Sequence, residues 1–240
     1  MAEVTDRHRA MLENFRNEFK RAKANPDKYP ITPSYLRLEI PLTATSYNTI
    51  QWDVLANETT YSGAVGATER RLGTTDAFKA ESIALYIAKV VVAAAPVISP
   101  TERSGMLLDS FVNPLTYLTT EAALLQGIYN GNLRLKIGAI TYFEAIDCMR
   151  FLRVGVSQRA VGSSAASNAP IPRNQWDAMQ WGMMPLTPQF TMLGTVSNSF
   201  TLNLPTSLDL RSAAGGVNMA VLYIRGLHAL NGGNVLKPSA

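Results

Sequence analysis

The run Phe78–Val92, with the sequence FKAESIALYIAKVVV, carries the strongest strand signal in the chain. Its bulkiest aliphatic residues, Ile83, Leu85 and Ile87, recur at every second position. That period of two is typical of a β-strand, in which alternate side chains point to opposite faces. The run contains Lys89 and leads into small residues and prolines, so it does not read as a membrane span. We interpret it as a buried strand.

Further strand candidates lie on both sides of this run. They are Tyr35–Ile40, Asn48–Leu55, Asn132–Ile137, Gln189–Leu193, Phe200–Leu204 and Met219–Leu230. The last of them is nearly all apolar, which predicts a central position in a sheet. Asn130-Gly131 is the best hairpin signal in the chain. Gln189–Leu193 and Phe200–Leu204 are separated by a spacing that is also typical of a hairpin.

Helical signals in the body of the chain are few. Thr119 or Thr120 can cap a short helix through Leu125. The stretch Phe143–Val156 is ambiguous and reads as a short helix ending near Cys148, followed by a strand. With roughly eight strand candidates and no alternation of strand and helix, the pattern favours an antiparallel β-sandwich or jelly roll.

Residues 1–30 differ from the rest, because they read as one charged, amphipathic helix. Met11, Leu12, Phe15 and Phe19 fall three or four positions apart, which places them on one face. That face has to be buried, and three interpretations are open. The helix packs on its own β-body, docks on a neighbouring subunit through Phe15 and Phe19, or faces nucleic acid.

Basic residues gather late in this helix, and the cluster consists of Arg16, Lys20, Arg21 and Lys23. Cations in the last turns of a helix are favoured by its dipole. The helix is expected to end at Asn25-Pro26. The formal net charge of the whole chain is +4, which is too small to demand a nucleic-acid partner. Clustered charge would nevertheless allow contact with a packaged genome or with an acidic neighbour.

Residue types that carry catalysis are scarce. His8 and His228 are the two histidines and Cys148 is the single cysteine, so the sequence predicts neither a zinc cluster nor an internal disulfide. Glu144 and Asp147 would share a helix face, where a surface ion-pair face is a simpler interpretation than an active site. No glycine-rich phosphate loop is present. We therefore expect no enzyme, no metal and no cofactor.

One segment concentrates large, soft side chains, with Trp176 and Trp181 close to Met179, Met183 and Met184. It reads either as a plug between the sheets or as an anchor between subunits, since Trp and Met are enriched at the centres of interfaces. In the second interpretation Trp176, Trp181 and Met183 are interface residues.

Several stretches resemble structural proteins of tailed and small icosahedral bacteriophages, particularly those that infect Bacteroidetes. They are Thr75–Ile87, Gly127–Gly131, Arg150–Leu152 with Val156–Gln158, and Met184–Gly194 followed by Phe200–Pro205. The similarity is one of style and order over about residues 70–230. It implies a capsid or capsid-associated role and transfers no catalytic residue.

The expectation is therefore a helical arm (residues 1–30) on a single β-sandwich or jelly-roll domain (residues 31–240), with 47% hydrophobic and 17% charged residues. We expect a capsid subunit that assembles with itself and with other virion proteins, made in the host cytoplasm and located in the virion. No membrane span is expected. The alternatives are a carbohydrate- or receptor-binding module and a capsid-decoration or tail-ring protein.

Overall fold

The computed structural model describes residues 2–56, 68–90, 108–110, 112, 117–152, 183–212 and 216–236. Within them the helices are α1 (Ala2–Arg21) and α3 (Thr119–Gln126), with 3-10 turns η1 (Pro26–Lys28), η2 (Gly127–Asn130), η3 (Cys148–Phe151) and η5 (Gly232–Asn234). The strands are β1 (Ile31–Pro41), β2 (Tyr47–Asp53), β3 (Ala77–Val90), β4 (Asn132–Ile137), β5 (Ile140–Asp147), β6 (Met184–Leu193), β7 (Asn198–Leu208) and β8 (Val217–Ala229).

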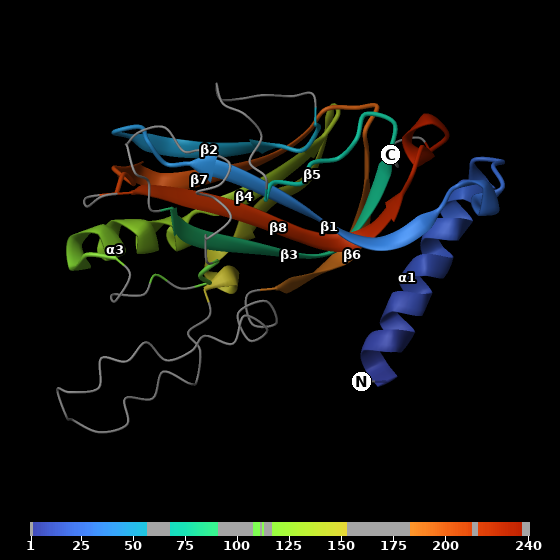
Figure 1. The fold of residues 1–240 in the computed structure, drawn as a ribbon, viewed down its shortest axis with the longest axis horizontal. Helices are drawn as coiled ribbons and strands as arrows, with labels where there is room; N and C mark the ends of the chain where they lie inside the picture. The colour runs from blue at the N-terminus through green and yellow to red at the C-terminus, as the bar shows by residue number, and fades with distance from the viewer. Residues whose placement is uncertain are drawn as a thin grey trace.

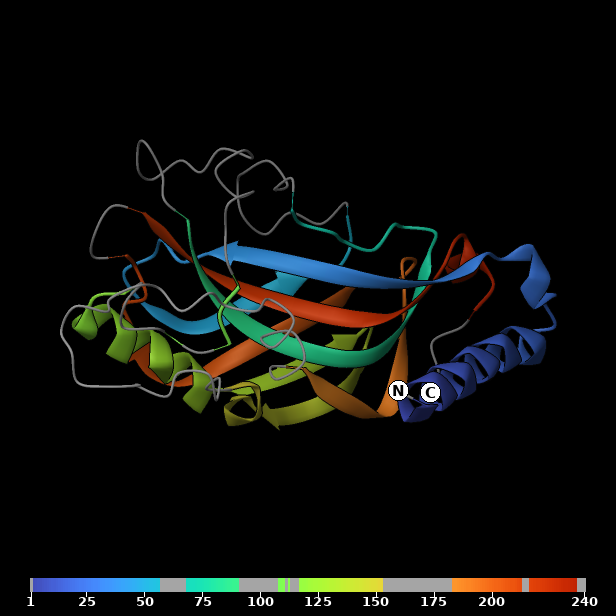
Figure 2. The ribbon, with the colours of Figure 1, turned by 60° about the horizontal axis from the view of Figure 1, so that its bottom comes forward.

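These strands form two four-stranded sheets. Sheet A has the order β1-β8-β3-β6 and sheet B the order β2-β7-β4-β5, and every pairing of named strands is antiparallel. The sheets stack as two layers (Figures 1 and 2) around one apolar core that draws on both. The Nε1 atom of Trp52 in β2 donates a hydrogen bond of 3.2 Å to the carbonyl oxygen of Ala220 in β8, which joins the sheets. The mainly β, antiparallel expectation is confirmed.

Sheet A is buried on both of its faces around β3 and β8. Side chains such as Leu85 and Leu222 belong to the core between the sheets, whereas Tyr86, Val221 and Met219 form a second apolar cluster with their neighbours. A strand buried on both faces has no polar side, which explains the nearly continuous apolar run near the C-terminus. β8 lies between β1 and β3, so its predicted central position is confirmed.

The two ends of the sandwich are built differently (Figure 1). At one end, here the α1 end, lie α1, the short turn from β4 to β5, the link from β6 to β7 and the residues that follow β8. At the other, here the α3 end, β3 leads through α3 to β4, and β5 leads to β6. These two connections span residues 91–131 and 148–183, so the α3 end has the longest connections in the chain.

Both predicted hairpins are wrong. Asn130-Gly131 joins the turn η2 to β4, and the tight turn of this region lies at Gly138, whose φ is +57°. The strands β6 and β7 belong to different sheets, so the link between them passes from sheet A to sheet B at the α1 end. A Cβ at Gly194 in this link would lie 1.9 Å from the carbonyl oxygen of Gly73, so the crossing requires glycine. The spacing between two strands in the sequence does not reveal whether they pair in one sheet or lie in opposite sheets.

Two further local predictions need correction. The predicted helix that ends near Cys148 is wrong, because strand β5 runs to Asp147 and the turn η3 (Cys148–Phe151) follows it. The end of the predicted strand, residues 153–156, lies outside the described residues. The helix α3 is present, but its N-cap position is Leu118, an apolar residue, and not Thr119 or Thr120. In both cases the ends of the element are set by packing at the α3 end, which local propensity does not record.

Candidate assembly surfaces

The apolar face of α1 packs on the outer face of sheet A. Phe15 and Phe19 are fully buried, and together with Met11 they contact Leu193 and Leu227, among other residues. This matches the first of the three interpretations of the helix. Within the monomer neither phenylalanine is exposed to a neighbour, so docking on another subunit would require α1 to leave this site.

A polar contact fixes the same helix. The carboxylate of Glu18 accepts hydrogen bonds from Lys79 Nζ in β3 and from Thr191 Oγ1 in β6, the latter at 2.8 Å. The Lys79 ammonium also lies 5.9 Å from the centre of the Phe15 ring, within the range of a cation–π contact. The Lys79 side chain is only 7% exposed and that of Glu18 is 30% exposed. The charge of the buried Lys79 ammonium is therefore balanced by the Glu18 carboxylate.

The C-terminus of α1 forms a Schellman motif. The N–H of Ala24 bonds the carbonyl of Phe19, and the N–H of Lys23 bonds that of Lys20. Lys23 has a φ of +59°, the left-handed conformation that glycine normally supplies at this position. The helix thus ends at Arg21, before the predicted stop at Asn25-Pro26, because the capping bonds close it first.

The basic cluster of α1 faces solvent. Arg16, Lys20, Arg21 and Lys23 are all exposed. Arg16 lies 3.9 Å from Asp27, and both side chains are at least half exposed, so this pair contributes little. Among the described residues the other three have no ion-pair partner. The cluster is therefore available to an external anion.

The helix α3 is held at the opposite end of β3 by a similar contact. Lys89 Nζ lies 3.1 and 3.2 Å from the two carboxylate oxygens of Glu121, and 5.6 Å from the centre of the Tyr117 ring. The Glu121 side chain is 1% exposed. The only charged residue of α3 therefore faces inward.

The outward face of α3 carries no charge. Thr120, Ala123 and Leu124 are exposed on this face, Leu124 by 41%. Leu118, just before the helix, is 52% exposed. In most surface helices the charged residues face outward and the apolar residues inward. Here the charge is inside, which makes this face a candidate contact surface.

Three of the four edge strands, β1, β5 and β6, carry features that hinder pairing with another strand. β6 carries Pro185 and Pro188, and its register shifts beside β3. β5 has two irregularities in its pairing with β4. On the other side, the segment that precedes β3 bridges β1 at Arg70, and its Leu72 bridges Leu55, two residues past the end of β2. Prolines, bulges and covering segments are the usual devices that prevent growth of a sheet at its edge.

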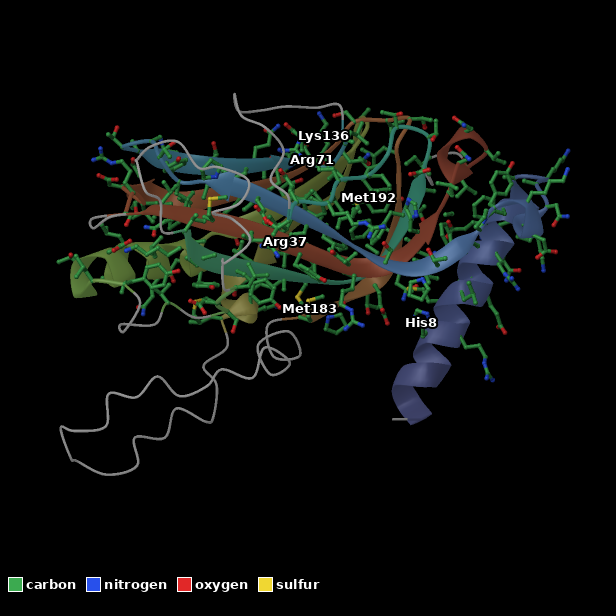
Figure 3. The ribbon with its side chains drawn as sticks, in the orientation of Figure 1. His8, Arg37, Arg71, Lys136, Met183 and Met192 are labelled. Carbon is green, nitrogen blue, oxygen red and sulfur yellow. The ribbon has the colours of Figure 1, made fainter. Side chains whose placement is uncertain are left out.

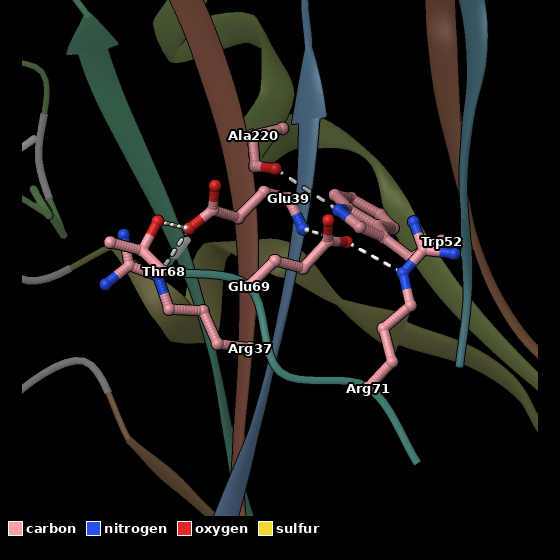
Figure 4. A network of polar contacts seen from close by, with 7 residues as sticks. All are labelled: Arg37, Glu39, Trp52, Thr68, Glu69, Arg71 and Ala220. Carbon is pink, nitrogen blue, oxygen red and sulfur yellow. Dashed lines mark hydrogen bonds and ion pairs between the residues drawn. The ribbon is translucent and has the colours of Figure 1, made fainter. Parts of the chain in front are cut away.

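A buried network holds that covering segment in place (Figure 4). Glu39 Oε1 accepts from Thr68 Oγ1 at 2.7 Å and lies 2.7 Å from Arg37 Nε. Glu69 Oε1 accepts from Arg71 Nε at 2.9 Å and from the backbone N–H of Glu39 at 3.3 Å. The Arg37 contact is an ion pair without hydrogen-bond alignment, since its Nε and Nη2 lack hydrogen-bond partners. Two carboxylates thus balance two guanidinium groups.

The remaining predicted residues fall in separate places. Trp176 and Trp181 lie outside the described residues. Met183 is partly buried against the outer apolar cluster of sheet A, ahead of β6 (Figure 3). His8 is on α1 and half-buried. His228 Nε2 lies 3.1 Å from Asp76 Oδ2 at the α1 end.

The carboxylate pair and the cysteine form no reactive site. Glu144 lies on strand β5, is 78% exposed and sits 3.9 Å from Arg134. The Asp147 side chain accepts from the N–H of Met149 and so caps the turn η3. Cys148 is buried, and burial together with the nearby Asp147 raises the pKa of its thiol to about 12. A protonated thiol is a poor nucleophile.

Comparison with known proteins identifies no relative: no family model, no curated protein and no solved structure matches this chain. Among the residues that the structure describes, no group of three or more His, Cys, Asp or Glu side chains is placed to hold a metal ion. The described helices include none that is long and apolar enough to cross a membrane.

Sequence reasoning missed the buried charges of Lys79, Lys89 and Glu121. A signal was available, because both lysines interrupt the most apolar strand of the chain. A charge in such a strand requires a partner of opposite sign. Its identity could not be read from the sequence, since the partners lie far from β3 along the chain.

Proposed function

We propose that this chain is a jelly-roll subunit of a virion shell, which assembles with copies of itself and with other virion proteins. The observation that carries the proposal is the order in which the strands pair. β1 pairs with β8, β2 with β7, β3 with β6 and β4 with β5. The first half of the body therefore pairs with the second half in reverse order.

This nested order is what a long antiparallel ribbon produces when it is rolled up. Rolling the ribbon also adds one pairing in each sheet between strands that are not partners in the ribbon. These added pairings are β3 with β8 in sheet A and β4 with β7 in sheet B. Eight strands in two packed sheets with this order fit the jelly roll, a fold that viral capsid domains use, as do lectin domains and cupins. The fold alone does not distinguish these uses, so the choice between them has to be argued from the surfaces of the subunit.

The protected edges favour assembly through faces and ends. With three of the four edge strands blunted or partly covered, contacts through helices, links and loops are favoured over pairing at the edges. The uncharged outward face of α3 lies among the longest connections of the chain. A second copy of this chain is the occupant that we propose for that face, since repeated weak contacts between identical subunits stabilise a closed shell. A ring or a decorating layer would use the same surfaces.

A ligand-binding module is the second candidate, because one hollow lies between the edge strands β5 and β6. Its volume is about 510 Å³, and Phe143, Ile146, Arg150 and Leu186 are among the residues that line it. It mixes charged and apolar walls, as sites for small ligands do. Titration of the monomer with a panel of glycans by calorimetry tests this candidate: saturable binding without assembly would favour it.

The decisive experiment compares two matched double variants. Leu118→Asp with Leu124→Asp changes the α3 face, and Ile140→Asp with Leu230→Asp changes two residues that are 40% and 47% exposed at the α1 end. Sedimentation velocity should show large assemblies for the wild type and the control. The α3 variant should require at least about tenfold more protein to assemble, since it buries charge in the contact. Equal assembly of both variants would contradict the use of this face.

A further inference from the structure

We propose that the exposed face of α1 binds the phosphate backbone of nucleic acid. Arg9, Arg16 and Lys20 lie seven and four residues apart, so they occupy one side of the helix over about 17 Å. Lys23 continues the cluster past the helix end. Among the residues whose side chains the structure describes, Glu13 is the one acidic residue on the same side of the helix. The result is a row of cations rather than one pocket.

The structure keeps this face cationic in a specific way. Between positions 8 and 28 the chain has six basic and three acidic residues. One of the three acids, Glu18, is turned inward to Lys79 and Thr191. Glu13 and Asp27 remain on the surface, and Asp27 lies 3.9 Å from Arg16. Six basic residues therefore face two exposed carboxylates over this stretch, so the exposed surface keeps an excess of positive charge.

Chemistry distinguishes nucleic acid from the other polyanions. A lipid surface would require exposed apolar residues on the same helix, but Met11, Phe15 and Phe19 are buried within the chain. An acidic patch on a second copy would require free carboxylates. Those of the described residues are largely held by partners, as Glu39, Glu121 and Asp209 illustrate. A flexible phosphate chain fits a row of separate cations without a matching surface.

The contact would also orient the subunit. Since α1 lies at the end of the sandwich opposite α3 (Figures 1 and 2), phosphate binding would direct the α1 end toward packaged nucleic acid. Only this orientation, with the genome as the natural ligand, rests on the proposed function. The phosphate contact itself does not.

The test uses fluorescence anisotropy of a labelled 20-nucleotide oligo-dT with the full-length protein. Four contacts predict that the logarithm of the association constant falls with the logarithm of salt concentration with a slope of about −3. The α1 variant carries Arg16→Gln, Lys20→Gln and Lys23→Gln. Its matched control carries Lys136→Gln, Arg211→Gln and Arg225→Gln, three exposed residues outside α1. Circular dichroism melts establish that both variants fold.

The α1 variant should bind at least about tenfold more weakly at low salt, with a slope shallower by about 2, and the control should match the wild type. Equal binding by both variants, or an equal loss in both, would overturn the inference. So would binding to phosphatidylglycerol vesicles but not to oligo-dT. Light scattering on the same samples measures assembly separately. A wild type that forms oligomers but does not bind oligo-dT would contradict this inference and leave the proposed function standing.

Discussion

The helices α1 and α3 are held to the same strand by the same kind of contact, yet they present opposite surfaces to solvent. Each turns a glutamate toward a lysine of β3, and each lysine also lies over an aromatic ring. Outside, α1 is basic and α3 is uncharged. Because the inward side chains hold each helix to sheet A, the outward face is free to serve another purpose. The difference between those faces is the basis for assigning one to nucleic acid and the other to a neighbouring subunit.

The largest expected effect comes from breaking the ion pairs that hold the two helices to β3. Lys89→Met leaves Glu121 buried and unpaired, which should lower the free energy of unfolding by about 3–5 kcal/mol. Lys79→Met should cost only about 1–2 kcal/mol, since Glu18 is partly hydrated and keeps its bond from Thr191. Urea unfolding measures both, with the exposed Lys136→Met as a control.

A second variant keeps this prediction specific to charge. Lys89→Met combined with Glu121→Leu removes both charges and should recover most of the loss, because a buried pair can be replaced by apolar residues at little cost. If Lys79→Met and Lys89→Met were equally costly, the two helices would not differ in how deeply their ion pairs are buried, and this half of the comparison would fail.

Alkaline pH should sharpen the contrast, because the α3 end contains buried acids. Burial raises the pKa of Cys148 to about 12 and raises the pKa of Tyr117 and Tyr129 well above the usual tyrosine value. Above pH 9 the unfolded chain loses the thiol proton while the folded chain keeps it. The unfolded state then binds fewer protons, so stability falls as pH rises, by about 1.4 kcal/mol per unit for Cys148.

Thermal melts at pH 8, 9 and 10 measure this effect, with Cys148→Ala as the comparison. The wild type should lose more stability than the variant between pH 9 and 10. Hydrogen exchange should show protection lost in α3 and η3 before α1. Parallel pH profiles for the two proteins would show that the thiol is not held protonated by burial.

The smallest expected effect concerns the end of α1. Lys23→Gly relieves the left-handed backbone of Lys23 and should stabilise the helix by about 0.5–1 kcal/mol, read as slower amide exchange in its last turn. The same change removes a cation from the proposed phosphate row, so it should weaken oligo-dT binding slightly while stabilising the helix. A destabilised helix would contradict the Schellman assignment.

The sequence predicted the strands other than β5 well and their partners poorly. Ile50, Trp52 and Val54 alternate in the sequence and are all buried, and the apolar C-terminal run is central in sheet A, as its composition indicates. Pairing between β1 and β8 joins the two ends of the body, and nothing local records it. The crossing from β6 to β7 was mistaken for a hairpin for the same reason.

The candidate surfaces were predictable in part. The basic cluster could be read directly, because it required only that one helix face be exposed. The α3 surface could not, since its significance depends on Glu121 pointing inward to Lys89, which lies on the other side of the connection 91–118. Burial of a charge is a property of the fold, so the face that it leaves uncharged becomes visible only in three dimensions.

The most direct test of the central claim is the assembly state of the purified full-length protein. Size-exclusion chromatography with light scattering, and negative-stain images of the peak, would measure it across a hundredfold range of concentration. We expect shells, rings or discrete high-order oligomers, which the α3 variant forms only at about tenfold higher protein concentration and the α1 phosphate variant forms as the wild type does. A clean monomer at the highest concentration, with or without oligo-dT, would contradict the shell-subunit account.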